Sequence, residues 1–293
     1  MRASNIRKLS LQVAFAILFP VSGNVFAGDS ILLQSTTSTA NSGLYDHILP
    51  VFTEKTGIAV NVVAVGSGQA IRNARNCDAD VLLVHAKREE NSFMADGMGM
   101  RRYDIMHNDF IIVGPYTDPA GINGLRNAKV AFGKIAKSKS LFVSRSDNSG
   151  THIREMQIWA QTEFDPLPDS GNWYLETGSG MGATLNAGIG MEAYVLTDRA
   201  TWIGYAGKSD YKVMVEGDPE MFNQYGAILV NPEKCPSVNT RGGRKFVEWL
   251  VSAEGQNAIA AHKRGGEQFF IPNSREETRS SPDRQSMRTS LSK

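Results

Sequence analysis

The chain has 293 residues, 41% of them hydrophobic, and a formal net charge of +1 because 31 basic residues nearly balance 30 acidic ones. When the first 27 and the last 19 residues are set aside, the remaining chain has four more acidic than basic residues. A nucleic-acid-binding surface needs an excess of basic residues, so this composition excludes that class of partner. An anion site in such a chain would have to depend on local hydrogen-bond donors.

The two ends of the chain differ from its body. Residues 1–27 place three basic residues before an apolar run and end in Val25-Phe26-Ala27, a pattern typical of a secretory signal peptide cleaved at that point. The apolar run is short and interrupted by polar residues, which argues against a membrane anchor. We therefore expect a periplasmic protein. Residues 275–293 contain almost no apolar side chains and are predicted to be disordered.

From residue 31 onward, short apolar runs alternate with segments of helical periodicity. The predicted strands are, in chain order, Ile31–Gln34, Ile58–Val65, Val81–His85, Phe110–Gly114, Leu141–Val143 and Tyr225–Val230. The predicted helices are Leu44–Phe52, a short helix from Gln69, Glu89–Gly97, Ile153–Trp159, Ala183–Ala193, Gly242–Ala253 and one around Ile259. Such alternation is typical of an α/β fold with parallel sheets, where ligands bind beyond the carboxyl ends of the strands.

Four donor-rich loops occupy this position between a strand and a helix. They are Ser35–Thr39, Gly66–Gly68, Ser144–Thr151 and Gly178–Gly182. The unpaired N–H groups and the dipole of a helix that begins there make such a loop favourable for a negative charge. One loop of this kind is commonly no more than a capped helix start. Four loops of the same design indicate a site for an anion.

The loop Ser144–Thr151 carries the strongest signal because it contains Arg145, whose planar guanidinium suits an oxyanion. A hydroxyl side chain of the loop can cap the following helix, and Gly150 lets a ligand approach the backbone closely. Glu155 adds a weak capping-box pattern. The loop is therefore predicted to be one wall of the anion site.

Cysteines and histidines give no sign of a metal site. The exported chain would hold two cysteines, Cys77 and Cys235, which can form one disulfide or remain two buried thiols. The histidines are His47, His85, His107, His152 and His262. Their spacing matches no zinc motif, and the chain lacks the G-x-S-x-G turn of a serine hydrolase. We expect no metal ion, no cofactor and no enzymatic activity.

From Ile31 to about Pro272, the sequence resembles the tungstate-binding periplasmic components of tungstate ABC importers. The motifs that carry the resemblance are STTSTANSGL at Ser35–Leu44, VGSGQA at Val65–Ala70, DADVLLVHA at Asp78–Ala86, HNDFIIVGP at His107–Pro115, SRSDNSGTH at Ser144–His152, WY with GSGMGATL in Trp173–Leu185, and YVLTDRATW at Tyr194–Trp202. Three residues depart from the family pattern. Ser35 and Ser67 stand where threonine is usual, and Cys77 stands where glycine is usual.

The resemblance implies the type II periplasmic binding-protein fold, in which two α/β lobes joined by two crossing strands close around an oxyanion. It implies a discontinuous first lobe of residues 28–112 and 226–274, and a second lobe of residues 113–225. The strands Phe110–Gly114 and Tyr225–Val230 bracket that second lobe and are the candidate hinges. A monomer that delivers its ligand to the membrane permease of an ABC importer is the implied working form.

Tungstate and molybdate are dianions at neutral pH, so a suitable site offers donors and no ionised acceptor. The residues predicted to bind the oxyanion are Thr36, Thr37, Ser67, Gly68, Arg145, Ser149, Gly150, Thr151, Ser179 and Gly180. Charge-assisted hydrogen bonds are roughly twice as strong as neutral ones, so Arg145 is expected to contribute most. The residues themselves do not separate tungstate from molybdate, which have almost the same size and charge.

Two other functions stay open at this point. Monohydrogen phosphate carries a proton, and its recognition benefits from a carboxylate acceptor. Asp147 in the third loop could supply one, although such a residue more often accepts backbone hydrogen bonds within a turn. The weaker alternative is a secreted hydrolase that acts on phosphoesters.

Overall fold

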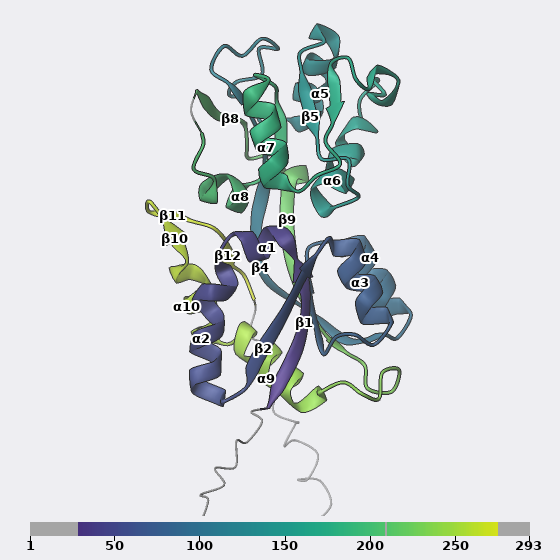
Figure 1. Cartoon of the computed structure of the whole chain (residues 1–293), viewed down its shortest axis with the longest axis vertical. Coiled ribbons are helices and arrows are strands. Elements are labelled where there is room, and N and C mark those ends of the chain that lie inside the picture. The colour runs from purple at the N-terminus through teal and green to yellow at the C-terminus, as the bar shows by residue number, and fades with distance from the viewer. Residues whose placement is uncertain (1–28, 209, 275–293) are drawn as a thin grey trace, which may run out of the picture.

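The structure, a computed structural model, describes residues 29–208 and 210–274. The strands are β1 (Ser30–Thr36), β2 (Ala59–Val65), β3 (Val81–Val84), β4 (Gly99–Pro115), β5 (Phe142–Ser144), β6 (Tyr174–Glu176), β7 (Val195–Asp198), β8 (Tyr211–Val215), β9 (Phe222–Val230), β10 (Lys263–Arg264), β11 (Glu267–Gln268) and β12 (Ile271–Pro272). The helices are α1 (Thr37–Asn41), α2 (Leu44–Thr56), α3 (Ser67–Arg75), α4 (Lys87–Ala95), α5 (Ala128–Ser138), α6 (Gly150–Trp159), α7 (Met181–Gly190), α8 (Arg199–Gly204), α9 (Thr240–Val251) and α10 (Ala253–Ala261), with short 3-10 turns at Leu167–Asp169 and Pro219–Met221. Two lobes lie one above the other, joined by β4 and β9 (Figure 1).

The first lobe is built on a sheet with strand order β12-β4-β9-β3-β1-β2. Its centre is covered on both faces, which explains the unbroken apolar run of β3. Val81 and Leu83 pack into a core with α2, α9 and α10 on one face. Leu82 and Val84 pack with α3 and α4 on the other face, because successive side chains of a strand point in opposite directions.

The second lobe surrounds the far end of β4. Strands β7 and β8 pair with β4 there, while β5 and β6 form a separate parallel pair. An aromatic core fixes α5 and α6 against β5 and β6. In it, the Phe132 ring lies 4.4 Å from Trp159, and the Phe142 ring stacks on Tyr174 at 6.0 Å. The loop between β5 and α6 is therefore held on a rigid base.

Strand β4 changes partners between Asp109 and Phe110. Up to Asp109 it pairs with β9 in the first lobe, and from Phe110 onward it pairs with β7 and then β8 in the second. In Figure 1, β4 and β9 run side by side from one lobe into the other. The predicted two-lobed α/β fold with two connecting strands is confirmed.

The expected parallel sheets are only partly correct. β1 is parallel to β2 and β3, but β3–β9, β4–β9, β4–β7 and β4–β8 are antiparallel. The sheets are mixed because the chain leaves the first lobe along β4 and returns along β9, and neighbouring strands that leave and return are antiparallel. No helix within the described ranges combines the length and hydrophobicity needed to cross a bilayer.

A disulfide bond joins the turn after α3 to the segment after β9 in the first lobe. Cys77, in the turn after α3, is bonded to Cys235, and their Cα atoms lie 5.2 Å apart. Cys77 has a φ of 65°, in the left-handed region that favours glycine. The disulfide links two segments that are 158 residues apart in the sequence.

Candidate functional site

The first hydroxyl loop divides its side chains between the core and the space between the lobes. Ser35 is fully buried, donates to the carbonyl oxygen of Leu83 at 2.8 Å and contacts the Tyr45 hydroxyl. Thr36 points the other way, as strand alternation requires, and caps α1. Its Oγ1 lies 2.7 Å from Thr39 Oγ1 and 3.2 Å from Ser38 Oγ.

The second loop leaves donors open at the start of α3. Gly66 precedes this helix and supplies no side-chain cap, so the N–H groups of the first turn are not satisfied in that way. Ser67 is 2% exposed, and no group in the described part of the chain bonds its hydroxyl. Gly68 follows at the next position, where an added Cβ would lie 3.5 Å from the end of the Arg72 side chain.

The third loop is ordered by its own side chains. Ser149 caps α6 by accepting the N–H of His152 at 3.3 Å. Asp147 accepts the N–H of Ser149 at 3.1 Å with one oxygen and the Arg145 guanidinium at 2.5 Å with the other. Burial alone would raise the pKa of Asp147, but hydrogen bonds from Ser149 and the charge of Arg145 outweigh it and hold that pKa below its usual range. Each oxygen of this carboxylate thus accepts a hydrogen bond within the loop.

The capping-box expectation for Glu155 is wrong. Glu155 lies six residues after the Ser149 cap, too far along the helix to reach the cap, whereas a capping box needs a residue three positions on. Its carboxylate instead accepts hydrogen bonds from side chains beneath the loop.

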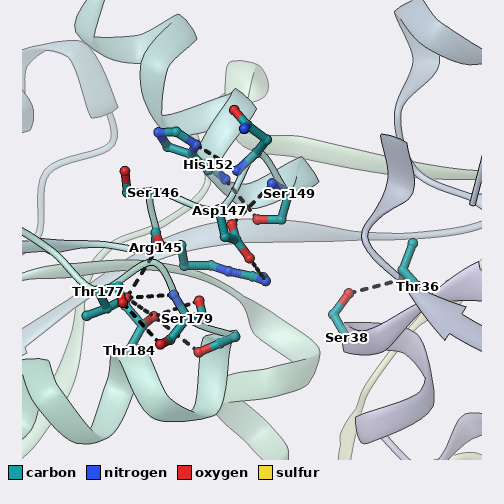
Figure 2. A network of polar contacts seen from close by, with 12 residues as sticks. Thr36, Ser38, Arg145, Ser146, Asp147, Ser149, His152, Thr177, Ser179 and Thr184 are labelled. Atoms are coloured by element: carbon teal, nitrogen blue, oxygen red, sulfur yellow. Dashed lines mark hydrogen bonds and ion pairs between the residues drawn. The ribbon is translucent and has the colours of Figure 1, made fainter. Parts of the chain in front are cut away.

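Arg145 is the central cation of this region. It is 5% exposed, and its Nε has no partner among the residues described. Figure 2 shows its guanidinium extending across toward Ser38 and Thr36 of the first lobe. Buried donors are normally paired, so the unpaired Ser67 hydroxyl and Arg145 Nε, one in each lobe, suit a ligand that accepts hydrogen bonds.

In the fourth loop, hydroxyl groups donate to carbonyl groups of the same loop, so fewer of its donors are open than the sequence suggested. Ser179 Oγ donates to the carbonyl oxygen of Thr177 at 3.1 Å, and Thr184 Oγ1 donates to that of Gly180 at 3.1 Å. The Ser179 hydroxyl proton is therefore directed into its own turn. Helix α7 has no side-chain cap at Gly180, so donors at its start stay open.

The structure brings the predicted residues together from both lobes. On the second-lobe side, Arg145, Ser149 and Ser179 lie near one another, and Thr36 lies opposite them (Figure 2). Thr151, in the first turn of α6, is 2% exposed, and Thr37, which begins α1, is half-buried.

Sequence reasoning did not select Ser38 or His85. Ser38 lies opposite Arg145 in Figure 2. His85 follows β3 and contacts the second lobe: a Cβ at Gly150 would lie 2.9 Å from its Cε1. Its Nδ1 is 2.8 Å from Asn223 Oδ1, and its ring stacks on Tyr225 at 4.6 Å. The position of His85 after a strand was the available signal, but the sequence suggested an ordinary surface or core histidine.

A cavity of about 360 Å³ lies beside the contact between His85 and Gly150. It is bordered by α4 of the first lobe and α6 of the second. The lobes therefore touch at His85 and Gly150 and leave open space between α4 and α6.

Two lobes that face each other with polar loops, joined by paired strands, define the class of binding proteins whose ligand lies between lobes. In agreement, the PBP superfamily domain matches residues 24–254. The tungstate-binding protein TupA of Peptoclostridium acidaminophilum is 43% identical over 251 residues, 84% of this chain and 87% of the relative. TupA of Campylobacter jejuni is 35% identical over 80% of this chain and 87% of its own length. The chain belongs to this family of tungstate-binding proteins within the PBP superfamily.

Solved structures give the same assignment. The tungstate-binding protein TupA from Desulfovibrio alaskensis G20 has 44% sequence identity and a TM-score of 0.75, covering 84% of this chain and all of the other. The tungstate ABC transporter structure from Geobacter sulfurreducens has 41% identity and a TM-score of 0.71, covering 78% of this chain and 97% of the other. These relatives are named as binding and transport proteins, and the chain is not an enzyme.

Proposed function

We propose that this protein captures tungstate, or molybdate, between its lobes and delivers it to the membrane permease of an ABC importer. The observation that carries the proposal is the buried Arg145, held by Asp147 and directed at the hydroxyl loop of the other lobe. An arginine in such a position provides charge and directional donors to an oxyanion. The names of the relatives support the choice of tungstate.

The proposed ligand contacts come from donors on both lobes. The ten residues are Thr36, Thr37, Ser67, Gly68, Arg145, Ser149, Gly150, Thr151, Ser179 and Gly180. Because the Ser179 hydroxyl donates to Thr177, the fourth loop would act through N–H groups at the start of α7. The proposed lobes are residues 28–112 with 226–274, and residues 113–225.

We propose that the protein works as a monomer in the periplasm. Its predicted signal peptide, residues 1–27, and the predicted disordered tail, residues 275–293, both lie outside the described residues. Export would expose the chain to an oxidising compartment, which agrees with a disulfide between Cys77 and Cys235.

Asp147 bears on the phosphate alternative. Recognition of monohydrogen phosphate benefits from a carboxylate that accepts its proton, and the Asp147 oxygens accept hydrogen bonds from Arg145 and Ser149 within the loop. A fully deprotonated dianion needs no such acceptor. The names of the relatives favour tungstate over phosphate and give the phosphoesterase alternative no support.

Thermal unfolding and calorimetry with tungstate, molybdate, sulfate and phosphate test the proposal. We expect tungstate and molybdate to raise the melting temperature most, because a ligand that binds only the folded state stabilises it. Arg145→Ala should weaken tungstate binding by roughly 10- to 100-fold or more, since a hydrogen bond to a charged group contributes about 1.5–3 kcal/mol. Arg126→Ala, at an exposed position of the second lobe, is the matched control. Near-normal tungstate affinity in Arg145→Ala would contradict the assignment.

A further inference from the structure

A carboxylate is buried directly beneath the oxyanion loop. Glu155 lies on α6, the helix whose first turn carries Gly150 and Thr151, and is 1% exposed. A buried carboxylate is costly unless it is paired, and here it stands on the same helix that is proposed to receive a dianion. The binding site as described so far gives this residue no role.

Glu155 accepts hydrogen bonds from three different segments. Ser144 Oγ donates to it at 2.9 Å, the Tyr174 hydroxyl at 2.7 Å and Trp159 Nε1 at 3.3 Å. Ser144 ends β5 and Tyr174 begins β6, so the carboxylate joins the helix to both strands of the small parallel pair. It therefore sits at the junction that supports the loop.

One of these bonds connects Glu155 to the backbone on both sides of Arg145. Ser144 directs its own proton to Glu155, and its oxygen accepts the N–H of Ser146 at 3.2 Å. Ser146 adopts a φ of 47°, which is unfavourable for a serine unless its surroundings fix it. Because Ser144 and Ser146 flank Arg145, the carboxylate helps to set the direction in which the guanidinium leaves the loop.

The charge of Glu155 opposes the proposed ligand. It lies five residues into the helix from Gly150, about 7.5 Å of helix rise, so an ionised Glu155 and a bound dianion repel each other. The ionisable groups that act on it are Tyr174 and Glu176 of β6, and Arg145, Asp147 and His152 form a further charged group in and after the loop. Burial raises the pKa of Glu155 to about 7, although its three donors work in the opposite direction.

The neighbouring side chains can also form hydrogen bonds with Glu155 in its protonated form. The Tyr174 hydroxyl lies 3.8 Å from Met156 Sδ as well as 2.7 Å from the carboxylate. If Glu155 takes a proton from solvent, its O–H can donate to the Tyr174 oxygen while the tyrosine proton turns to the Met156 sulfur. The bond from Ser144 then needs no change.

We propose that Glu155 is a positioning residue for the oxyanion loop and that it takes up a proton when a dianion binds to that loop. This inference rests on the proposed function. Its consequence is that tungstate affinity falls as pH rises above neutrality, by up to about tenfold per pH unit. Tungstate itself carries no proton at these pH values, so the proton must come to the protein.

Calorimetry of tungstate binding at pH 7.5 in buffers with different heats of ionisation measures this proton uptake. For the wild type, we expect a binding heat that depends on the buffer. Glu155→Gln should retain tight binding at pH 8 with no proton uptake at this position, because glutamine keeps the shape without the charge. Glu155→Ala should bind at least tenfold more weakly, and comparison with the glutamine variant separates positioning from charge.

Glu176→Gln is the matched control. Glu176 accepts hydrogen bonds from Ser146 and Ser170 at 2.6 Å but is exposed, and these bonds hold its pKa below the usual range. This variant should keep the wild-type proton uptake. Uptake that persists in Glu155→Gln but is lost in His152→Gln would overturn the inference, as would wild-type binding with no buffer dependence. A wild type that binds none of the oxyanions would overturn the proposed function and the inference with it.

Discussion

A substitution at Ser67 should affect ligand binding and stability differently. Its hydroxyl is buried without a partner in the described part of the chain, so the folded protein bears a cost for it. We expect Ser67→Ala to leave the free energy of unfolding unchanged or slightly higher. The same change should weaken tungstate binding by roughly 10- to 100-fold, because a hydrogen bond to a charged group is lost. Denaturant unfolding and calorimetry on one preparation measure both quantities.

Ser252→Ala provides the opposite pattern as a control. Ser252 caps α10 by accepting the N–H of Gly255 at 3.3 Å, far from the loops that face the other lobe. Removing such a cap typically costs about 1 kcal/mol of stability, and tungstate affinity should not change. If Ser67→Ala behaved like Ser252→Ala, the Ser67 hydroxyl would have a structural role only.

Strands and helices with a distinct pattern of apolar residues were predictable from the sequence. Strands that form only because another strand pairs with them were not. The run Leu82 to Val84 predicts a buried strand because every side chain in it is apolar. The first part of β4, from Gly99 to Asp109, includes two arginines and two aspartates and lacks regular alternation. It is a strand because β9 pairs with it, a contact between residues more than 100 positions apart.

The same limit applies to the candidate site. The donor-rich loops could be found because each is local to one strand and one helix. That Ser35 turns to the core and that Glu155 meets Tyr174 depends on segments brought together by folding. Ser179 bonds a carbonyl only two residues away, in a turn whose geometry its residue type does not indicate. Residue type alone carried no information about these directions.

The turn after α3 combines a disulfide bond with a left-handed backbone conformation at the same residue. Cys77 holds a left-handed conformation that glycine adopts without strain, and it does so while bonded to Cys235. Removing a disulfide that closes a long loop typically costs about 2–5 kcal/mol. We therefore expect Cys77→Gly with Cys235→Ala to be less stable than the oxidised wild type. The variant with alanine at both positions should be less stable again, by about 1 kcal/mol.

Chemical denaturation of the three proteins checks this order. The two double variants share the same change at the buried Cys235, so their difference isolates the backbone conformation at position 77. Equal stability of the two would show that the positive φ is not a source of strain. Tungstate affinity should be alike in all three, because the turn lies at the opposite end of α3 from Ser67.

At the scale of the whole molecule, the contact of His85 with Gly150 joins the two lobes. A Cβ at Gly150 would come within 2.9 Å of the His85 ring, so Gly150→Ala must displace the ring or the lobe. We expect this variant to bind tungstate at least about tenfold more weakly, since about 1.4 kcal/mol of strain suffices for that change. A second substitution, His85→Ala, should recover part of the loss.

A double-mutant cycle on calorimetric affinities measures this coupling. Gly190→Ala is the control, because a Cβ at Gly190 in α7 meets no atom of the described residues within 4 Å and should leave the affinity unchanged. Strictly additive effects of the two substitutions would mean that the clash does not govern how the lobes approach each other.

The strands that join the lobes determine how the molecule can close. Asp109, at the last pair of β4 with β9, is held by Arg199 of α8 through bonds of 2.5 and 2.8 Å, and α8 also packs on the first lobe through Ala200 and Ile203. The register of β4 with β9 shifts between Asp104 and Met106, where the regular pairing is interrupted. We predict that the lobes close on binding, so that Ser67 and Arg145, whose donors are unpaired among the described residues, contact one ligand.

Small-angle X-ray scattering with and without saturating tungstate tests this closure. We expect the radius of gyration of the wild type to decrease on binding, because hinge motion brings the lobes together around the ligand. Arg145→Ala at the same tungstate concentration should keep the profile of the unbound protein, since the charge that draws the oxyanion to both lobes is missing. Identical wild-type profiles at a concentration shown by calorimetry to saturate the site would mean that binding needs no closure. In that case Thr36 and Ser67 would already lie within reach of a ligand held by Arg145.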